Sequence, residues 1–351
     1  MIKTLSPHYK TIPWLSPESG TVPDFYTLNI YIWSGLKASV PVSPTYEFKQ
    51  LNPLQRLGNS EIDVARYVND VLSTSLVQDS TTNILDSNAA VWVKTEVIYT
   101  ITGAIQPPLF EVTELAVKGY GYGMSGKNPS TPTNNILAPG EQSNAYNKGV
   151  FVLPILLEEN TTKAIEIYSA TVSKPFTTPS TDDSTKMIQT IWIDCSEFDG
   201  DWIEVKVDGV IVYTIRLKDE QRYTPTDIFF TDKEGVLFSI PFFKKREESL
   251  SVTSESYETS GLQPSEGNHQ YKTYNTDGKS KFNMNTGFVS EDNNDTFKQL
   301  MLSNDVWEYK NGTYTPLKLG SKNIEYQTRQ EQRLLNYNIE FEYAFNEINN
   351  A

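Results

Sequence analysis

The sequence has very few of the residues that most often carry catalysis or bind metals. Its 351 residues include one cysteine, Cys195, and two histidines, His8 and His269. A single cysteine excludes an intramolecular disulfide and a paired-cysteine metal site. Histidine is the usual general base and zinc ligand, so two isolated histidines disfavour a Ser-His-Asp site or a histidine-rich metal site. We therefore favour a protein that is not an enzyme.

The one cysteine also lies in an unpromising environment for chemistry. Cys195 belongs to the apolar run TIWIDCSEF, and both histidines are far from it in sequence. A nucleophilic cysteine needs a base or a positive environment that lowers the pKa of its thiol. The run instead favours a buried and unreactive side chain.

Positive charge and long hydrophobic runs are also scarce. The chain has 30 Lys and Arg against 44 Asp and Glu, which gives a net charge of −14. Binding to nucleic acid needs clustered positive charge, so we expect no nucleic-acid partner. No apolar run reaches membrane-spanning length, and three prolines interrupt the N-terminal segment. We expect no signal peptide, no membrane insertion and synthesis in the cytoplasm.

Aromatic residues are abundant, and apolar residues recur with a period of two. Hydrophobic residues make up 38% of the chain and aromatic residues 12%. Alternation is clear over residues 26–33 and 91–101, as expected for half-buried antiparallel strands. Asp208-Gly209 and Asn311-Gly312 predict tight turns within hairpins at 202–217 and 306–315. The predicted fold class is mainly β, with antiparallel β-sandwich-type domains, one or two short helices and long polar loops.

The last predicted strand covers residues 335–345 and alternates most regularly. Its predicted hairpin partner is 323–328, and its length exceeds that of a usual strand. We assign its first half to the core and its end, from Phe341 through Tyr343 to Phe345, to an intersubunit contact. The residues predicted on one face are Leu335, Tyr337, Ile339, Phe341, Tyr343 and Phe345.

Helices and polar segments suggest how the chain is divided. The patterns predict a helix over 60–72, capped by Ser60, and a shorter one over 296–302. Ser, Thr, Asn, Pro and Gly dominate three polar stretches, which we interpret as loops: 124–148, 173–186 and 254–281. Because a chain of this length favours two domains, we place β-rich domains at 1–175 and 187–351.

A glycine-rich segment, KGYGYGMSGK at 118–127, resembles a phosphate-binding loop only superficially. Such a loop must open an amphipathic helix, whereas the polar sequence NPSTPTNN follows this one. We predict the end of a strand and a bulged loop. Tyr120 and Tyr122 are candidates for a contact site, because tyrosine and glycine combine rigid rings with an adaptable backbone.

Two acidic clusters are candidates for Ca²⁺ ligands or for a glycosidase carboxylate pair. Neither has the spacing of a calcium-binding loop, so solvated turns are the favoured interpretation. The segment DCSEFDGDW is the one to test first for Ca²⁺. The clusters are Asp194, Glu197, Asp199 and Asp201, and Glu291, Asp292 and Asp295.

Three function classes fit these patterns. The favoured class is a structural protein that acts through protein interfaces, because aromatic residues are spread over many strands. One alternative is a carbohydrate-binding β-sandwich module or adhesin, in which exposed Trp or Tyr rings contact a host-surface glycan. The other is a β-rich glycoside hydrolase that uses paired carboxylates.

The chain also resembles the tail and baseplate structural proteins of tailed bacteriophages. The resemblance is diffuse and is clearest in residues 223–258, residues 288–319 and the ending LLNYNIEFEYAFNEIN. The segment KGYGYG fits the same resemblance. It implies a virion component that assembles in several copies with itself and with other virion structural proteins. It implies no active site and no cofactor.

Overall fold

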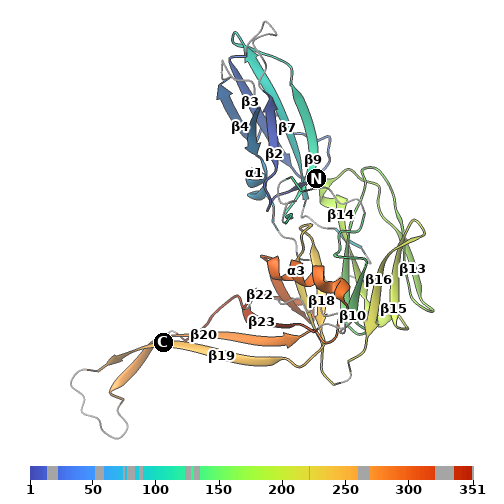
Figure 1. The fold of residues 1–351 in the computed structure, drawn as a ribbon, viewed down its shortest axis with the longest axis vertical. Coiled ribbons are helices and arrows are strands. Elements are labelled where there is room, and N and C mark those ends of the chain that lie inside the picture. The colour runs from blue at the N-terminus through green and yellow to red at the C-terminus, as the bar shows by residue number, and fades with distance from the viewer. Residues whose placement is uncertain are drawn as a thin grey trace.

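The computed structural model consists mainly of β-strands arranged in five sheets, with three short α-helices among the described residues. The described residues are 1–13, 23–51, 59–73, 76, 84–86, 90–122, 128–129, 135–220, 222–259, 269–320 and 336–349. Figure 1 shows the N-terminal sheet at the top, a β-sandwich to the right and a long hairpin that extends away at the lower left. The predicted mainly-β class is confirmed.

The N-terminal sheet has strand order β1-β9-β7-β3-β4, with β8 on β7, and β1 is parallel to β9. The alternation predicted for 26–33 and 91–101 is confirmed, since Leu28 and Val93 belong to one core and Trp33 and Trp92 to another on the opposite face. The strands are β1 (Ile2–Lys3), β3 (Phe25–Trp33), β4 (Tyr46–Leu51), β7 (Ala90–Ile101), β8 (Ala104–Ile105) and β9 (Phe110–Val117).

One face of this sheet is covered by α1 (Ala65–Asn69) and by the strand pair β2 (Tyr9–Pro13) and β5 (Asn59–Asp63). The helix predicted over 60–72 is therefore wrong in its first part, which forms β5. The predicted cap at Ser60 is also wrong, because the helix begins after Val64 and the side chain of Asp63 accepts the Ala65 amide at 3.1 Å. Strand pairing with β2 outweighs the weak helical preference of the β-branched residues.

The β-sandwich packs a five-stranded sheet, β10-β16-β15-β12-β13, against a three-stranded sheet, β11-β14-β6. The hairpin predicted at 202–217 is confirmed, and Asp208 and Gly209 have the positive φ angles that its turn requires. The strands are β6 (Ile84–Asp86), β10 (Gln142–Tyr146), β11 (Val150–Leu156), β12 (Ala164–Tyr168), β13 (Ser173–Thr177), β14 (Ile188–Asp194), β15 (Trp202–Val207) and β16 (Val210–Lys218); α2 (Ser184–Met187) and the 3-10 helix η3 (Cys195–Glu197) flank β14.

This topology corrects the predicted division into 1–175 and 187–351. Strands β12 and β13 lie at or before the predicted boundary at 173–186, yet β12 pairs with β15 on the other side of it. Apart from β6, which pairs with β14 of the sandwich, the chain leaves the N-terminal sheet after Val117 and enters the sandwich at β10. The polar residues at 173–177, which the sequence pattern suggested were a loop, form the edge strand β13 beside β12.

The C-terminal sheet has strand order β18-β17-β21-β22-β23-β20-β19, with β24 on β20, and all of its pairings are antiparallel. Phe297 and Leu300 of α3 pack into the core that this sheet shares with the sandwich. The elements are β17 (Thr226–Thr231), β18 (Leu237–Phe242), β19 (Glu247–Glu258), β20 (Tyr271–Asn285), η4 (Glu291–Asn293), α3 (Asn294–Leu302), β21 (Val306–Lys310), β22 (Thr313–Leu319), β23 (Asn338–Tyr343) and β24 (Glu347–Asn349).

Several local predictions can be checked in this sheet. The hairpin at 306–315 and its Asn311-Gly312 turn are confirmed, and α3 matches the helix predicted over 296–302. The polar stretch 254–281 is not the predicted loop, because β19 and β20 occupy much of it. Likewise, β10 lies inside the predicted loop 124–148.

The long terminal strand predicted at 335–345 is shorter in the structure. Strand β23 ends at Tyr343, and the chain turns through Ala344 and Phe345 before β24. The partners of β23 are β20 and β22, while Leu335 and the predicted partner strand 323–328 lie outside the described residues.

Candidate interaction surface

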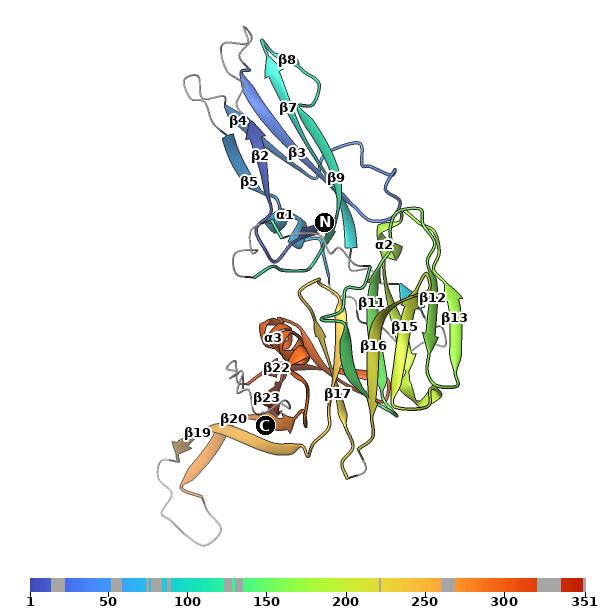
Figure 2. The same ribbon diagram turned by 45° about the vertical axis from the view of Figure 1, so that its right-hand side comes forward.

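The longest fully exposed strand among the described elements is β19, which forms a hairpin with β20. We use "the arm" for β19 together with residues 271–281 of β20. The two strands pair from Glu247 opposite Asn283 to Glu258 opposite Tyr271. Both views show the arm leaving the body of the molecule, with β19 along its outer edge (Figures 1 and 2). A strand of this length spans roughly 40 Å at about 3.4 Å per residue.

Every residue of β19 is exposed, and so are the first five residues of β20. Exposed apolar and aromatic side chains recur along both strands, and Tyr257 packs edge-to-face on Tyr274 at 5.8 Å between ring centroids. Clustered exposed apolar groups mark surfaces that contact other molecules. The large apolar or aromatic side chains of the arm that are about half exposed are Leu250, Val252, Tyr257, Tyr271 and Tyr274.

The outer half of the arm is a two-stranded ribbon. Strand β24 pairs with β20 only at residues 276–278, and beyond these β19 is the only pairing partner of β20 among the described residues. Where the arm becomes two-stranded, the pairing register shifts between Thr253 and Glu255 of β19, and Asn275 of β20 has a φ of 50°. Bulges increase twist, and an isolated two-stranded ribbon is marginally stable in water. The outer arm therefore gains the most from a further contact.

The base of the arm is held by Arg246, the residue that precedes β19. Its guanidinium lies 3.8 Å from the ring centroid of Phe282 and donates hydrogen bonds of 2.6 Å to Glu308 and to the hydroxyl of Tyr343. Glu308 is buried, so this charge pair is largely removed from water. A charge-assisted network of this kind fixes the direction in which the arm leaves the sheet.

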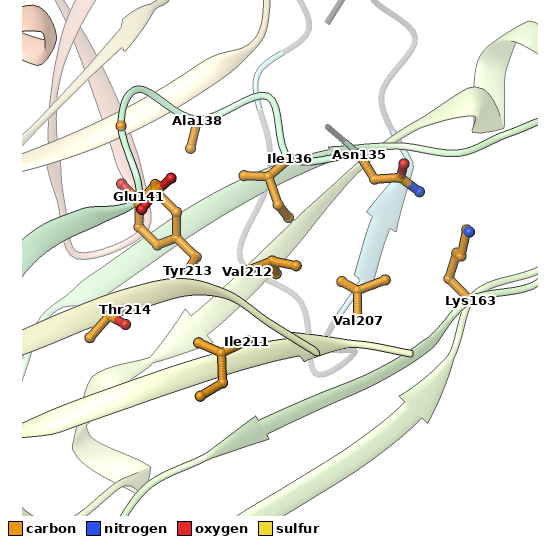
Figure 3. A pocket seen from close by; sticks show the side chains of 11 residues that line it. Asn135, Ile136, Ala138, Glu141, Lys163, Val207, Ile211, Val212, Tyr213 and Thr214 are labelled. Carbon is orange, nitrogen blue, oxygen red and sulfur yellow. The ribbon is translucent and has the colours of Figure 1, made fainter. Parts of the chain in front are cut away.

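A second candidate surface is a groove of about 510 Å³ beside β16 (Figure 3). Residues 135–141 line one wall, and the first residues of β16 line the other. Pairing between β10 and β16 begins at Thr214, so residues 211–213 of β16 border the groove without a ladder to β10. Glu141 and Lys163 lie toward opposite ends, and Ile211 is half exposed. The groove is a smaller surface than the arm.

The predicted contact residues Tyr120 and Tyr122 lie against α3 of the same chain. The hydroxyl of Tyr122 donates to Asp295, and the amide of Tyr120 donates to the Lys233 carbonyl at 2.8 Å. Lys298 also lies over the ring of Tyr122, with 3.7 Å between its Nζ and the ring centroid. Burial raises the pKa of the Tyr120 phenol. These tyrosines join the N-terminal sheet to the C-terminal sheet, an internal contact that the sequence pattern did not indicate.

The three predicted contact residues at the end of the chain differ in exposure. Phe341 is fully buried and stacks on Phe282 at 5.5 Å, so its assignment to an intersubunit contact is corrected: it belongs to the core. Tyr343 is half-buried in the network of Arg246. Only Phe345 is exposed, at 49% of its surface. The β-strand period places Phe341 inward, and the chain turn after Tyr343 releases Phe345.

The first acidic cluster is spread over separate local contacts. Asp194 accepts the Ser196 amide, Glu197 pairs with Lys174, and Asp199 accepts hydrogen bonds from Ser169 and Thr171. The hydrogen bonds to Asp199 lower its pKa to about 2, with the Ser169 hydroxyl as the largest cause. These contacts close turns, as the sequence favoured.

The second acidic cluster is divided in the same way. The Asp292 carboxylate accepts a hydrogen bond from the Gln142 side chain, and the Asp295 carboxylate accepts hydrogen bonds from the side chains of Tyr122 and Gln299. Within the described residues, no group of three or more His, Cys, Asp and Glu side chains is placed to hold a metal ion.

A buried charged cluster connects β1 to the turn between β17 and β18. Lys3 and Glu234 form an ion pair at 2.8 Å, and both side chains are buried. Asp232 is fully buried, and its Oδ1 accepts the amides of Glu234 at 2.8 Å and Val236 at 3.1 Å. Burial, with repulsion from Glu234, raises the pKa of Asp232 well above the usual value.

Cys195 is buried, as predicted, and burial raises the pKa of its thiol. None of the helices in the described ranges has the length and apolarity needed to cross a bilayer. Comparison with family models found no match to the chain, and comparison with curated proteins found none either.

Proposed function

We propose that this protein is a non-enzymatic structural subunit that assembles through its arm. The observation that carries this proposal is the complete exposure of β19, with half-exposed Leu250 and Val252 in the middle of the strand. An exposed edge strand offers unpaired backbone donors and acceptors to another chain. The exposed apolar side chains add contact area along the same element.

The assembly that we propose is a virion, and within it the tail or baseplate of a tailed bacteriophage. This part of the proposal rests on the resemblance in residues 223–258 and 288–319, the first of which includes all of β19. Its partners are copies of itself and other virion structural proteins. A projecting arm suits such a subunit, because it reaches a neighbour without requiring that the two bodies fit closely together.

The test compares assembly by the full chain with assembly by two double variants. Leu250→Ser with Val252→Ser removes apolar side chains that are each 56% exposed on the arm. Leu51→Ser with Ile105→Ser is the matched control, because those side chains are 78% and 73% exposed on β4 and β8 of the N-terminal sheet. Each protein is co-expressed with the proteins encoded beside it, and complexes are measured by sedimentation velocity.

We expect the full chain and the control variant to enter a complex and the arm variant to remain monomeric. Thermal unfolding should be nearly unchanged in both variants, because exposed substitutions usually change the free energy of unfolding by less than about 0.5 kcal/mol. An arm variant that assembles as well as the full chain contradicts the role of the arm. A full chain that stays monomeric, alone and with every virion protein, contradicts the structural role.

A further inference from the structure

Among the described residues, β19 pairs only with β20, and its outer edge is protected against strand addition by just four glutamates and one bulge between Thr253 and Glu255. Lysine, proline, bulges or short length commonly protect edge strands. Two other edge strands in the described ranges carry such residues: β4 has Lys49, and β13 has Lys174 and Pro175. By contrast, the sequence of β19, EESLSVTSESYE, contains no lysine, arginine or proline over twelve residues. This edge is long and open to pairing.

The charge of β19 indicates the chemistry of a matching strand. It carries four glutamates and no basic residue. Lys279 and Lys281 of β20 form ion pairs with Glu342 of β23, on the side of β20 away from β19. Two other cations lie close to β19: Arg246 pairs with Glu248 at 2.7 Å, and Lys272 of β20 is opposite Tyr257. The charge of Lys279 and Lys281 is thus directed toward β23, and the four glutamates of β19 outnumber Arg246 and Lys272, so β19 keeps an acidic edge. Opposite charges on facing strands stabilise pairing, whereas like charges oppose it.

A second copy of β19 fits this edge poorly. Antiparallel pairing of two copies over their full length places Glu247 opposite Glu258 of the second copy. It also gathers eight glutamates along one seam, twice the four of one strand, between two chains that each carry a net charge of −14. A partner strand with basic residues avoids both the contact between Glu247 and Glu258 and the accumulation of glutamates along the seam.

We propose that the edge of β19 accepts an extended strand, bearing lysine or arginine, from a different protein. The added strand continues the C-terminal sheet beyond β19, with main-chain hydrogen bonds for affinity and cations facing the glutamates for selectivity. Apolar residues at alternate positions of that strand cover Leu250 and Val252, which share one face of β19. This inference rests on the proposed function and specifies the chemistry of the partner.

The probes are three fluorescent peptides as long as β19, titrated into the full chain and followed by fluorescence anisotropy. The first alternates valine with lysine. The second has glutamate in place of every lysine. The third keeps the lysines but has alternate backbone amides N-methylated, which removes donors that a strand ladder needs while leaving the charge unchanged.

We expect saturable binding of the lysine peptide that weakens as salt is raised. The glutamate and N-methylated peptides should each bind about tenfold more weakly or not at all, because one loses the charge match and the other loses the ladder. The chain variant Glu247→Lys with Glu255→Lys should lose about tenfold in affinity for the lysine peptide. Asp201→Lys, at an exposed turn in the sandwich, is the matched control and should bind normally.

Each other outcome overturns the inference. Equal binding of the N-methylated peptide means general electrostatic attraction and not strand addition. Equal binding of the glutamate peptide, or no binding of the lysine peptide, means that the edge does not select a basic strand. If the chain alone dimerises and the variant Glu247→Lys with Glu255→Lys alters that dimerisation, the occupant of the edge is a second copy. In all of these cases, assembly through the arm is decided separately by the serine variants.

Discussion

The two edge strands of the C-terminal sheet differ completely in exposure. Strand β18 lies at one end, and all six of its residues are buried. Strand β19 lies at the other end, and all twelve of its residues are exposed. They follow one another along the chain, separated by only a few residues. The same sheet thus has one edge that the protein covers itself and one that it leaves open.

The sequences of the two strands account for the difference. Strand β18 reads LFSIPF, which is apolar on both faces, and it lies against the sandwich: Phe151 of β11 packs edge-to-face on Phe238 at 5.5 Å. The Ser239 hydroxyl accepts the Val152 amide at 3.2 Å, which satisfies a polar group of β11 at this contact. Strand β19 has only two aliphatic residues among many serines and glutamates, too few to form a core. It therefore projects into solvent.

The largest expected effect is at the covered edge. Phe238→Ala removes a fully buried ring that contacts Phe151 and Phe230, and we expect it to lower the free energy of unfolding by about 3–5 kcal/mol. Val252→Ala at the open edge should change it by less than about 0.5 kcal/mol. Urea unfolding followed by tryptophan fluorescence measures both. Similar losses from the two substitutions would show that the contrast between the edges is not energetic.

A smaller effect is expected where the arm meets the sheet. Arg246→Met leaves the buried Glu308 without its 2.6 Å ionic partner, and we expect a loss of about 2–3 kcal/mol. Adding Glu308→Gln to this variant should restore part of the lost unfolding free energy, because it removes the unpaired charge. The coupling between the two sites is obtained from urea unfolding of both single variants and the double variant. Additive losses would mean that Arg246 does not act through Glu308.

Sequence reasoning performed best where local signals and burial agree. The Asp208-Gly209 and Asn311-Gly312 turns follow from the backbone angles that these residues readily adopt, and both hairpins form. Strands with strong alternation also form as predicted, because one of their faces is buried. Phe341 was correctly placed on an apolar face. Whether that face meets the core or a partner depends on distant strands, and here Phe341 packs into the core against Phe242 of β18.

The arm could not be recognised as a strand pair from its sequence. Leu250 and Val252 alternate with serines, but the rest of β19 and the start of β20 are polar on both faces, which also describes a loop. Tyr120 and Tyr122 illustrate the opposite error. Their glycine-rich context suggested an exposed contact, but Gly119 lies against the backbone of Glu234, where a Cβ atom would approach the carbonyl carbon to 2.9 Å. Such a close approach within the chain is a tertiary feature that local sequence does not encode.

The last of these effects concerns carboxylates and depends on pH. Asp232 begins the turn into β18 and is fully buried, whereas the glutamates of β19 are exposed. Its raised pKa means that the folded state holds a proton that the unfolded state releases above the usual aspartate range. The free energy of unfolding should therefore fall as pH rises above that range, by up to about 1.4 kcal/mol per pH unit, until the pH passes the pKa of the folded state. Asp232→Asn cannot ionise, so its unfolding free energy should lack this component of the slope.

Urea midpoints of the wild type and Asp232→Asn, measured at steps from pH 4 to pH 8, test this expectation. The two proteins should differ least at the acid end, where Asp232 is protonated in the folded state. They should diverge steadily as the pH rises, in favour of the variant. Parallel curves would show that Asp232 does not couple folding to pH. In that case the covered edge would carry its buried carboxylate at no cost in stability, and the electrostatic contrast with the exposed glutamates of β19 would not hold.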